Sequence, residues 1–209
     1  AQSLLKHVIR FILKEYEKDL SFLNQEFTKR QLQLKKEDRD EMDLIQKLNF
    51  VLNQDFEIIT YNEAFDILKK SKKNKKGKFV FPIDNWGIDF QSEHEKFLVE
   101  KVFKKPVVIT DYPKKIKAFY MRQNDDDKTV RAMDVLMPGI GEVIGGSQRE
   151  ERLNYLLKRM EEMEISKEEL RYYFNLPKKF YWDYKNQEMI FNLGAKFLKM
   201  LGFETAIKR

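Results

Sequence analysis

The chain has 209 residues, of which 42% are hydrophobic and 13% aromatic, so it can bury a core and is not disordered throughout. Charged residues make up 35%, and 40 basic against 34 acidic residues leave a net charge of +6, which is compatible with a polyanionic partner without requiring one. There is no cysteine, and His7 and His94 are the only histidines, which excludes disulfides, thiolate metal sites and histidine-rich metal sites.

The first third of the chain predicts helices interrupted by one strand. Apolar residues recur at helical spacing before the strand and again behind it. The predicted helices cover residues 4–13, 20–27, 44–52 and 61–70. The strand runs from Phe56 to Thr60, and Thr60 or Asn62 can cap the helix that follows. Residues 30–43 are mostly charged or Gln and are interpreted as a solvated helix or loop.

A lysine run follows these elements. Seven of the ten residues 69–78 are lysine, with Lys69 first and Lys78 last. One interpretation is a solvated hairpin tip or flexible loop. The functional interpretation is contact with RNA phosphate, which would make binding depend on salt. No aromatic residue is interleaved in the run, so it does not indicate stacking on bases.

The remainder of the chain predicts a sheet between helices. Strands are predicted over residues 106–110, 118–121, 129–137 and 142–147. Helices are predicted over residues 91–101, 150–163 and 191–201. A further helix is predicted to begin at the capping box of residues 166–169. Short polar connections favour antiparallel pairing. The predicted fold class is α/β (α+β), an antiparallel sheet flanked by helices, as a single domain over residues 1–209 that includes the basic loop 69–78.

Two carboxylates and a glycine form the most site-like pattern. Asp134 and Glu142 lie on strands joined by a tight Pro-Gly connection, and such a hairpin can bring both to one face. Two hard oxygen ligands suit Mg²⁺ held on nucleotide phosphates. Gly145 allows a ligand to approach the backbone, and Arg149 can bind a carboxylate or amide oxygen through two hydrogen bonds. From spacing alone, a charged hairpin capped by an Arg ion pair remains an alternative.

Four motifs follow one another in the order that one enzyme family uses. They are residues 91–98 (QSEHEKFL), 110–113 (TDYP), 118–121 (AFYM) and 138–153 (PGIGEVIGGSQREERL). Together they resemble class II asparaginyl-tRNA synthetases, and the similarity is dense from about Ile88 to Leu157. The resemblance implies a class II aminoacyl-tRNA synthetase catalytic core, of which this chain would hold an incomplete part. It also implies activation of asparagine by ATP and transfer to tRNA.

The resemblance assigns a nucleotide site to the hairpin. Asp134 and Glu142 match the positions that hold Mg²⁺ and ATP. Gly145 matches a position that packs against the nucleotide. On this basis the expected metal ligands are Asp134 and Glu142.

The resemblance also implies an amino-acid site. Arg149, with Gln148 beside it, matches the arginine that reads the side chain of the amino acid. A helix start near the substrate pocket would be formed by Gln91, Glu93 and His94. Taken by itself, His94 is more typical of a structural histidine.

Two features depart from the family pattern. In the family, a strand-loop-strand carries an Arg and a Glu that bind the α-phosphate and the adenine. This element and the dimer-forming helix lie upstream of the helix that residues 4–13 resemble. In the last motif, Lys196 stands where the family has an acid, and Phe197 stands where it has an Arg that binds the ATP phosphates. Losing one such preorganised charge typically costs ~10²–10³ in rate. We therefore expect that this chain alone does not aminoacylate tRNA.

The leading hypothesis is a degenerate, non-catalytic homologue that acts as a structural subunit of a larger assembly and needs no cofactor. Its partners would be other protein chains that cover the open edge of the sheet. One alternative is part of an active asparagine–tRNA ligase, which would use ATP and Mg²⁺. A second is an asparagine- or nucleotide-sensing or RNA-binding module, with RNA or tRNA contacting Lys69 to Lys78.

No apolar run reaches the ~18 residues of a membrane span, and the first residues do not resemble a signal peptide. We therefore expect an intracellular protein of the cytoplasm or a mitochondrion, without membrane insertion.

Overall fold

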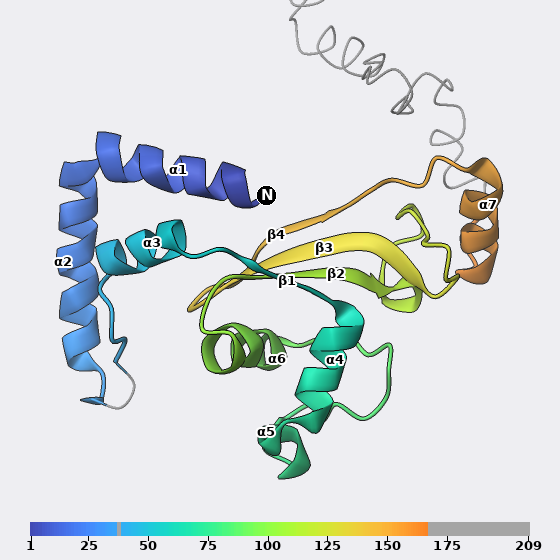
Figure 1. Ribbon diagram of the computed structural model, residues 1–209, viewed down its shortest axis with the longest axis horizontal. Coiled ribbons are helices and arrows are strands. Elements are labelled where there is room, and N and C mark those ends of the chain that lie inside the picture. The colour runs from blue at the N-terminus through green and yellow to red at the C-terminus, as the bar shows by residue number, and fades with distance from the viewer. Residues whose placement is uncertain (37–38, 167–209) are drawn as a thin grey trace, which may run out of the picture. The chain divides into compact units, whose positions relative to one another are not determined.

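The computed structural model describes residues 1–36 and 39–166 (Figure 1). The chain divides into two compact units, Ala1–Gln148 and a second that begins at Arg149, and each is described by itself. The predicted capping box at 166–169, the helix over 191–201, and Lys196 and Phe197 lie outside the described residues. No helix within the described ranges has the length and apolar character needed to cross a membrane.

The first unit alternates helices with four strands, and the second contributes one described helix. The helices are α1 (Gln2–Glu15), α2 (Glu17–Gln33), α3 (Leu44–Asn53), α4 (Tyr61–Lys70), α5 (Lys72–Lys75), α6 (Ser92–Lys96), the π-helix η2 (Phe97–Val102), the 3-10 helix η3 (Lys114–Ile116) and α7 (Leu153–Glu162). The strands are β1 (Glu57–Thr60), β2 (Val107–Pro113), β3 (Thr129–Met137) and β4 (Gly141–Ser147).

The four strands form one sheet in the order β1-β2-β3-β4. The predicted antiparallel pairing is confirmed for β2 with β3 and for β3 with β4. It is wrong for β1, which pairs with β2 in parallel. The reason is the long connection through α4, α5 and α6, which returns the chain to the end of the sheet where β1 began.

Three other predicted elements differ from the structure. Residues 118–121 form no strand, because Phe119 and Tyr120 lie in a turn, and the chain then contacts β3 through an isolated bridge between Gln123 and Val130. The short second helix is longer than expected, since α2 continues into the charged stretch. The predicted helix 91–101 begins as α6 and continues as a π-helix, a form often found at functional sites.

The cap predicted for α4 is confirmed. The Thr60 hydroxyl accepts a hydrogen bond from the Glu63 backbone at 3.2 Å, and the Glu63 carboxylate accepts one from the Thr60 backbone at 2.7 Å. This reciprocal capping box fixes where β1 ends and α4 begins.

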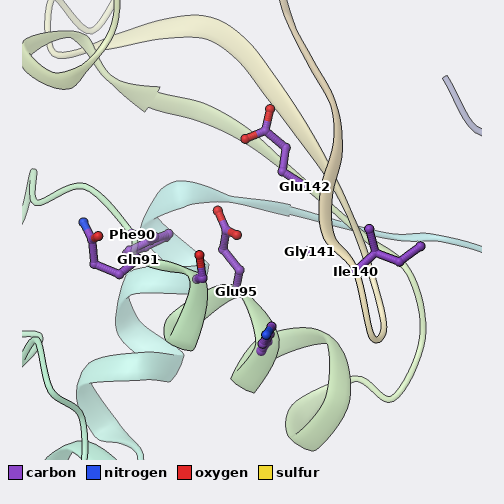
Figure 2. A pocket seen from close by; sticks show the side chains of 8 residues that line it. Phe90, Gln91, Glu95, Ile140, Gly141 and Glu142 are labelled. Atoms are coloured by element: carbon purple, nitrogen blue, oxygen red, sulfur yellow. The ribbon is translucent and has the colours of Figure 1, made fainter. Parts of the chain in front are cut away.

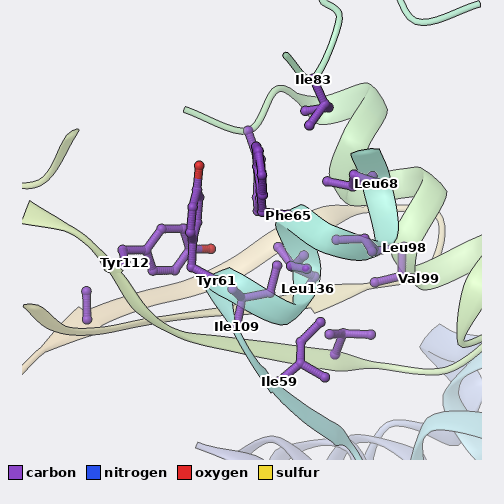
Figure 3. Packing of buried hydrophobic residues seen from close by; sticks show 14 of the residues in the cluster. Ile59, Tyr61, Phe65, Leu68, Ile83, Leu98, Val99, Ile109, Tyr112 and Leu136 are labelled. Carbon is purple, nitrogen blue, oxygen red and sulfur yellow. The ribbon is translucent and has the colours of Figure 1, made fainter. Parts of the chain in front are cut away.

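The larger core lies between one face of the sheet and the helices α4 and η2 (Figure 3). Tyr61, at the start of α4, is fully buried and stacks on Phe90 with ring centroids 4.6 Å apart. Its hydroxyl donates to the Ile88 carbonyl at 2.7 Å and accepts from the Gly87 backbone at 3.2 Å. Tyr61 therefore fixes the loop that leads into α6.

A smaller core covers the opposite face of the sheet. Val108 and Val135 point to this face, because successive side chains of a strand alternate between its two sides. Leu5 of α1 and Val51 of α3 pack against them, so these two helices cover the second face.

Candidate functional site

Asp134 and Glu142 point to the same face of the sheet because β4 contains a β-bulge. Asp134 of β3 pairs with Gly145, whereas Leu136 pairs with Glu142, so Val143 is an extra residue in β4. Without it, Glu142 would point to the opposite face from Gly145, since the two are three residues apart. The bulge therefore brings the two predicted carboxylates together.

Gly145 leaves the space in which both carboxylates lie. A Cβ atom at this position would stand 2.5 Å from Glu142 Oε1 and 3.4 Å from Asp134 Oδ1. Any side chain here would displace the Glu142 carboxylate, because real Cβ atoms do not approach so closely. Glycine is therefore required at this position by the Glu142 carboxylate, whereas the sequence alone suggested only that a ligand could approach the backbone here.

A lysine and a tyrosine complete the surroundings of Asp134, which is itself buried. Lys117 Nζ lies 2.8 Å from Asp134 Oδ2 and 4.0 Å from the centre of the Tyr112 ring. The Tyr112 hydroxyl is hydrogen-bonded to Asp134, and burial followed by this carboxylate raises the pKa of Tyr112. Asp134 is therefore held by two donors and keeps its second oxygen near Gly145.

A third carboxylate, Glu95 of α6, lines a pocket of about 400 Å³ together with Glu142. The pocket is lined by Phe90, Gln91, Ser92, Glu95, Lys96, Ile140, Gly141 and Glu142. Figure 2 shows Glu95 extending from α6 toward the hairpin that carries Glu142. Burial, and then the negative charges of Glu142 and Asp134, raise the pKa of Glu95 to about 7.

Sequence reasoning missed Glu95. Ser92 and Glu95 have the spacing of a capping box, so Glu95 would be interpreted as turning back to the helix start. The capping partner of the Gln91 backbone is instead His94, whose Nδ1 accepts from it at 2.9 Å. The only sequence signal for Glu95 is its place in the motif at residues 91–98.

Of the residues predicted to form a helix start near the substrate pocket, Gln91 lines the pocket described here, whereas Glu93 and His94 do not. His94 is fully buried and donates from Nε2 to the Phe81 carbonyl at 2.7 Å. Burial lowers its pKa, which keeps the ring neutral. Glu93 accepts from the Phe81 backbone at 2.8 Å. Both residues hold the segment before α6, because side chains adjacent along a helix point in different directions.

Gln148, one of the two predicted amino-acid-binding residues, does not line the pocket of Glu95 and Glu142. Gln148 accepts from Arg131 at 3.0 Å. It lines a separate pocket of about 610 Å³ that also includes Thr110, Arg131 and Met133. Arg149 is the first residue of the second unit and is described only within it.

The donor set limits what the site can bind. Within residues 1–36 and 39–166, no group of three or more acidic, histidine or cysteine side chains is arranged to hold a metal ion. Asp134 and Glu142 by themselves are the smaller set that Mg²⁺ uses when substrate phosphates supply the other oxygens. The position of both carboxylates over Gly145 fits that arrangement.

We expect Glu95→Gln to stabilise the protein above neutral pH. Because the folded pKa of about 7 lies above the ordinary 4.5, this carboxyl contributes stability below pH 4.5 that is lost as the pH rises through 7. Gln is neutral throughout, so the variant should gain on the order of 1–2 kcal/mol at pH 8 after allowance for solvent screening. Denaturant unfolding from pH 4 to 8 measures this, with exposed Glu41→Gln as control; curves that match wild type at every pH would contradict it.

The sequence and the structure both have similar known proteins. The family described as tRNA synthetases class II (D, K and N) matches residues 1–190. An asparagine–tRNA ligase of Clostridium acetobutylicum is 45% identical over 207 residues, which cover 99% of this chain and 40% of that protein. The asparagine–tRNA ligase of Desulfitobacterium hafniense is 47% identical over 178 residues, which cover 85% of this chain and 35% of that protein.

A solved structure agrees with the sequence matches. Asparaginyl-tRNA synthetase of Pyrococcus horikoshii has a TM-score of 0.62 and 30% identity, covering 84% of this chain and 35% of its own. The same enzyme complexed with asparaginyl-adenylate matches with a TM-score of 0.62. The chain thus spans about 35–40% of the length of these curated relatives.

Proposed function

Because the chain belongs to the family of class II tRNA synthetases (D, K and N), we propose that it forms part of an ATP-dependent asparagine–tRNA ligase. The observation that carries this proposal is the placement of Asp134 and Glu142 on one face around Gly145. The match of 99% of this chain to an asparagine–tRNA ligase supports asparagine as the amino acid.

The two carboxylates would hold Mg²⁺ on the phosphates of ATP. Bound there, the ion would neutralise charge that develops as the phosphates react. Lys117 keeps Asp134 in position through its 2.8 Å ion pair. Gly145 leaves the space above the strand to these two carboxylates. Glu95 lies on the other side of the pocket, where a bound cation would favour the ionised form of this carboxyl.

Asparagine and tRNA would contact other parts of the chain. We assign the side chain of asparagine to Arg149, whose planar guanidinium can donate two hydrogen bonds to an amide oxygen. Gln148 would support the same site. Lysines between Lys69 and Lys78 would contact phosphates of the tRNA.

A non-catalytic structural subunit is the second candidate. The observation that favours it is in the sequence, where Lys196 and Phe197 replace the acid and the arginine of the last family motif. Protein partners would then cover β1 and β4, which are the edges of the described sheet.

ATP–pyrophosphate exchange by the full-length protein separates the two candidates. The ligase should exchange pyrophosphate in the presence of asparagine and Mg²⁺, and should not do so when aspartate replaces asparagine. A folded protein that gives no asparagine-dependent exchange would overturn the ligase proposal and leave the structural subunit.

A further inference from the structure

The lysine run is not uniformly solvated, because three of its lysines are already engaged. Lys69 donates to the Asp84 carbonyl at 3.1 Å, and Lys70 pairs with Asp66 at 2.8 Å. Lys73 lies 4.4 Å from the centre of the Phe79 ring and 3.8 Å from a Glu93 oxygen. These three residues attach the run to the fold.

The other four lysines form what we call the lysine face. Lys72, Lys75, Lys76 and Lys78 are all exposed. None of them makes an ion pair with another residue of the described chain, whereas Lys69, Lys70 and Lys73 all find partners. Four unpaired charges within seven residues create a locally positive surface that attracts polyanions.

The backbone under the lysine face is held in one conformation. Ser71 caps α5 by accepting from the Asn74 backbone at 3.1 Å. The Asn74 side chain then bridges to Ile83, donating to its carbonyl at 3.1 Å and accepting from its backbone N–H at 2.9 Å. Because Ile83 is buried in the core, this bridge fixes the turn to the body of the unit. The lysine face is therefore preorganised, contrary to the flexible loop that the sequence suggested.

An exposed aromatic residue stands beside the lysine face. Phe81 has 56% of its surface exposed, although its backbone is bonded on both sides, to Glu93 and to His94. It follows Lys78 by three residues, so the Cα atoms of Lys78 and Phe81 are at most about 11 Å apart. Nothing in the core requires an aromatic side chain at this position, since the hydrogen bonds there use only the backbone.

We propose that the lysine face and Phe81 bind an unpaired segment of RNA, with the lysines on phosphates and the ring stacked on a base. The identification of that RNA with tRNA rests on the proposed function. A single strand is favoured over a duplex because only an unpaired base presents a free face for stacking. A lipid surface is disfavoured because α5 has four residues and forms no long amphipathic helix.

The test measures fluorescence anisotropy of this chain with a labelled single-stranded RNA of about 12 nucleotides. The first variant replaces Lys72, Lys75, Lys76 and Lys78 by Gln. Its matched control replaces four other exposed lysines, Lys18, Lys35, Lys36 and Lys101. The first should lose affinity roughly 10²-fold and reduce the slope of log K against log salt by about 3, whereas the control should change affinity less than about threefold.

Phe81 is tested separately because its substitution leaves the charge unchanged. Phe81→Ala should lower the affinity for the single-stranded RNA at least about fivefold, and Phe81→Trp should restore it. The affinity for an RNA duplex of matching sequence should be the same in both variants as in the unmodified protein. Equal losses in both lysine variants, or no effect of Phe81→Ala, would overturn the proposal. So would lysine-dependent binding to phosphatidylserine vesicles without binding to RNA. Pyrophosphate exchange needs no RNA, so a failure here is distinguishable from a failure of the ligase proposal.

Discussion

Replacing Asp134 by Asn, or Glu142 by Gln, is expected to reduce asparagine-dependent pyrophosphate exchange of the full-length protein by about 10²–10³-fold. Each substitution keeps the shape of the side chain and removes one of the two negative oxygen donors around Gly145. An amide is a weaker ligand for Mg²⁺ than a carboxylate, so the loss should be partly recovered at higher Mg²⁺ concentration.

The measurement is the exchange rate as a function of Mg²⁺, with circular dichroism to verify that each variant is folded. Asp125→Asn is the matched control, because Asp125 is an exposed carboxylate in the turn before β3. It should exchange at the rate of the unmodified protein. Variants of Asp134 and Glu142 that exchange as fast as this control would remove both residues from the nucleotide site.

Tyr61→Ala is expected to lower the free energy of unfolding by about 3–5 kcal/mol, the usual cost of deleting a large buried aromatic side chain. The ring is fully buried and packs against three aromatic rings from two other segments, Phe90 and Trp86 of the loop before α6 and Tyr112 of β2, with centroid distances of 4.6, 6.0 and 5.6 Å. Its hydroxyl is also bonded to the loop before α6. The substitution therefore removes packing and leaves two partly buried backbone groups without their partner.

Two further variants separate these effects in denaturant unfolding. Tyr61→Phe keeps the ring and loses only the hydroxyl, so it should cost about 1–2 kcal/mol. Phe22→Ala is the control, since Phe22 of α2 is 62% exposed and should change stability by less than about 1 kcal/mol. A Tyr61→Ala variant as stable as the Phe22→Ala control would show that this cluster is not central to the core.

Tyr61 also connects the stability of the core to the site. Its hydroxyl fixes residues 87 and 88, and α6 with Glu95 begins four residues later. His94 and Glu93 fix the same region from the other side through Phe81. The position of the third carboxylate thus depends on contacts between segments that are far apart in sequence.

Local chemistry was sufficient to predict much of the fold. Apolar spacing predicted α1, α3 and α4, and the strands predicted over residues 129–137 and 142–147 correspond to β3 and β4. The Thr60 cap was also predictable, because both of its partners lie within three residues. The family resemblance, carried mainly by residues 138–153, is now supported by a family match over residues 1–190.

Long-range contacts decided what local patterns could not. The sequence presented Asp134 and Glu142, but their common face depends on the extra residue Val143 in β4, which only the pairing register reveals. It predicted His94 for the pocket, but packing against Phe79 and the bond to Phe81 place that ring in the core and Glu95 in the pocket. Residue types were thus determined by the sequence alone. Which side chains share a face was decided by the tertiary structure, because bulges and helix rotation depend on partners distant along the chain.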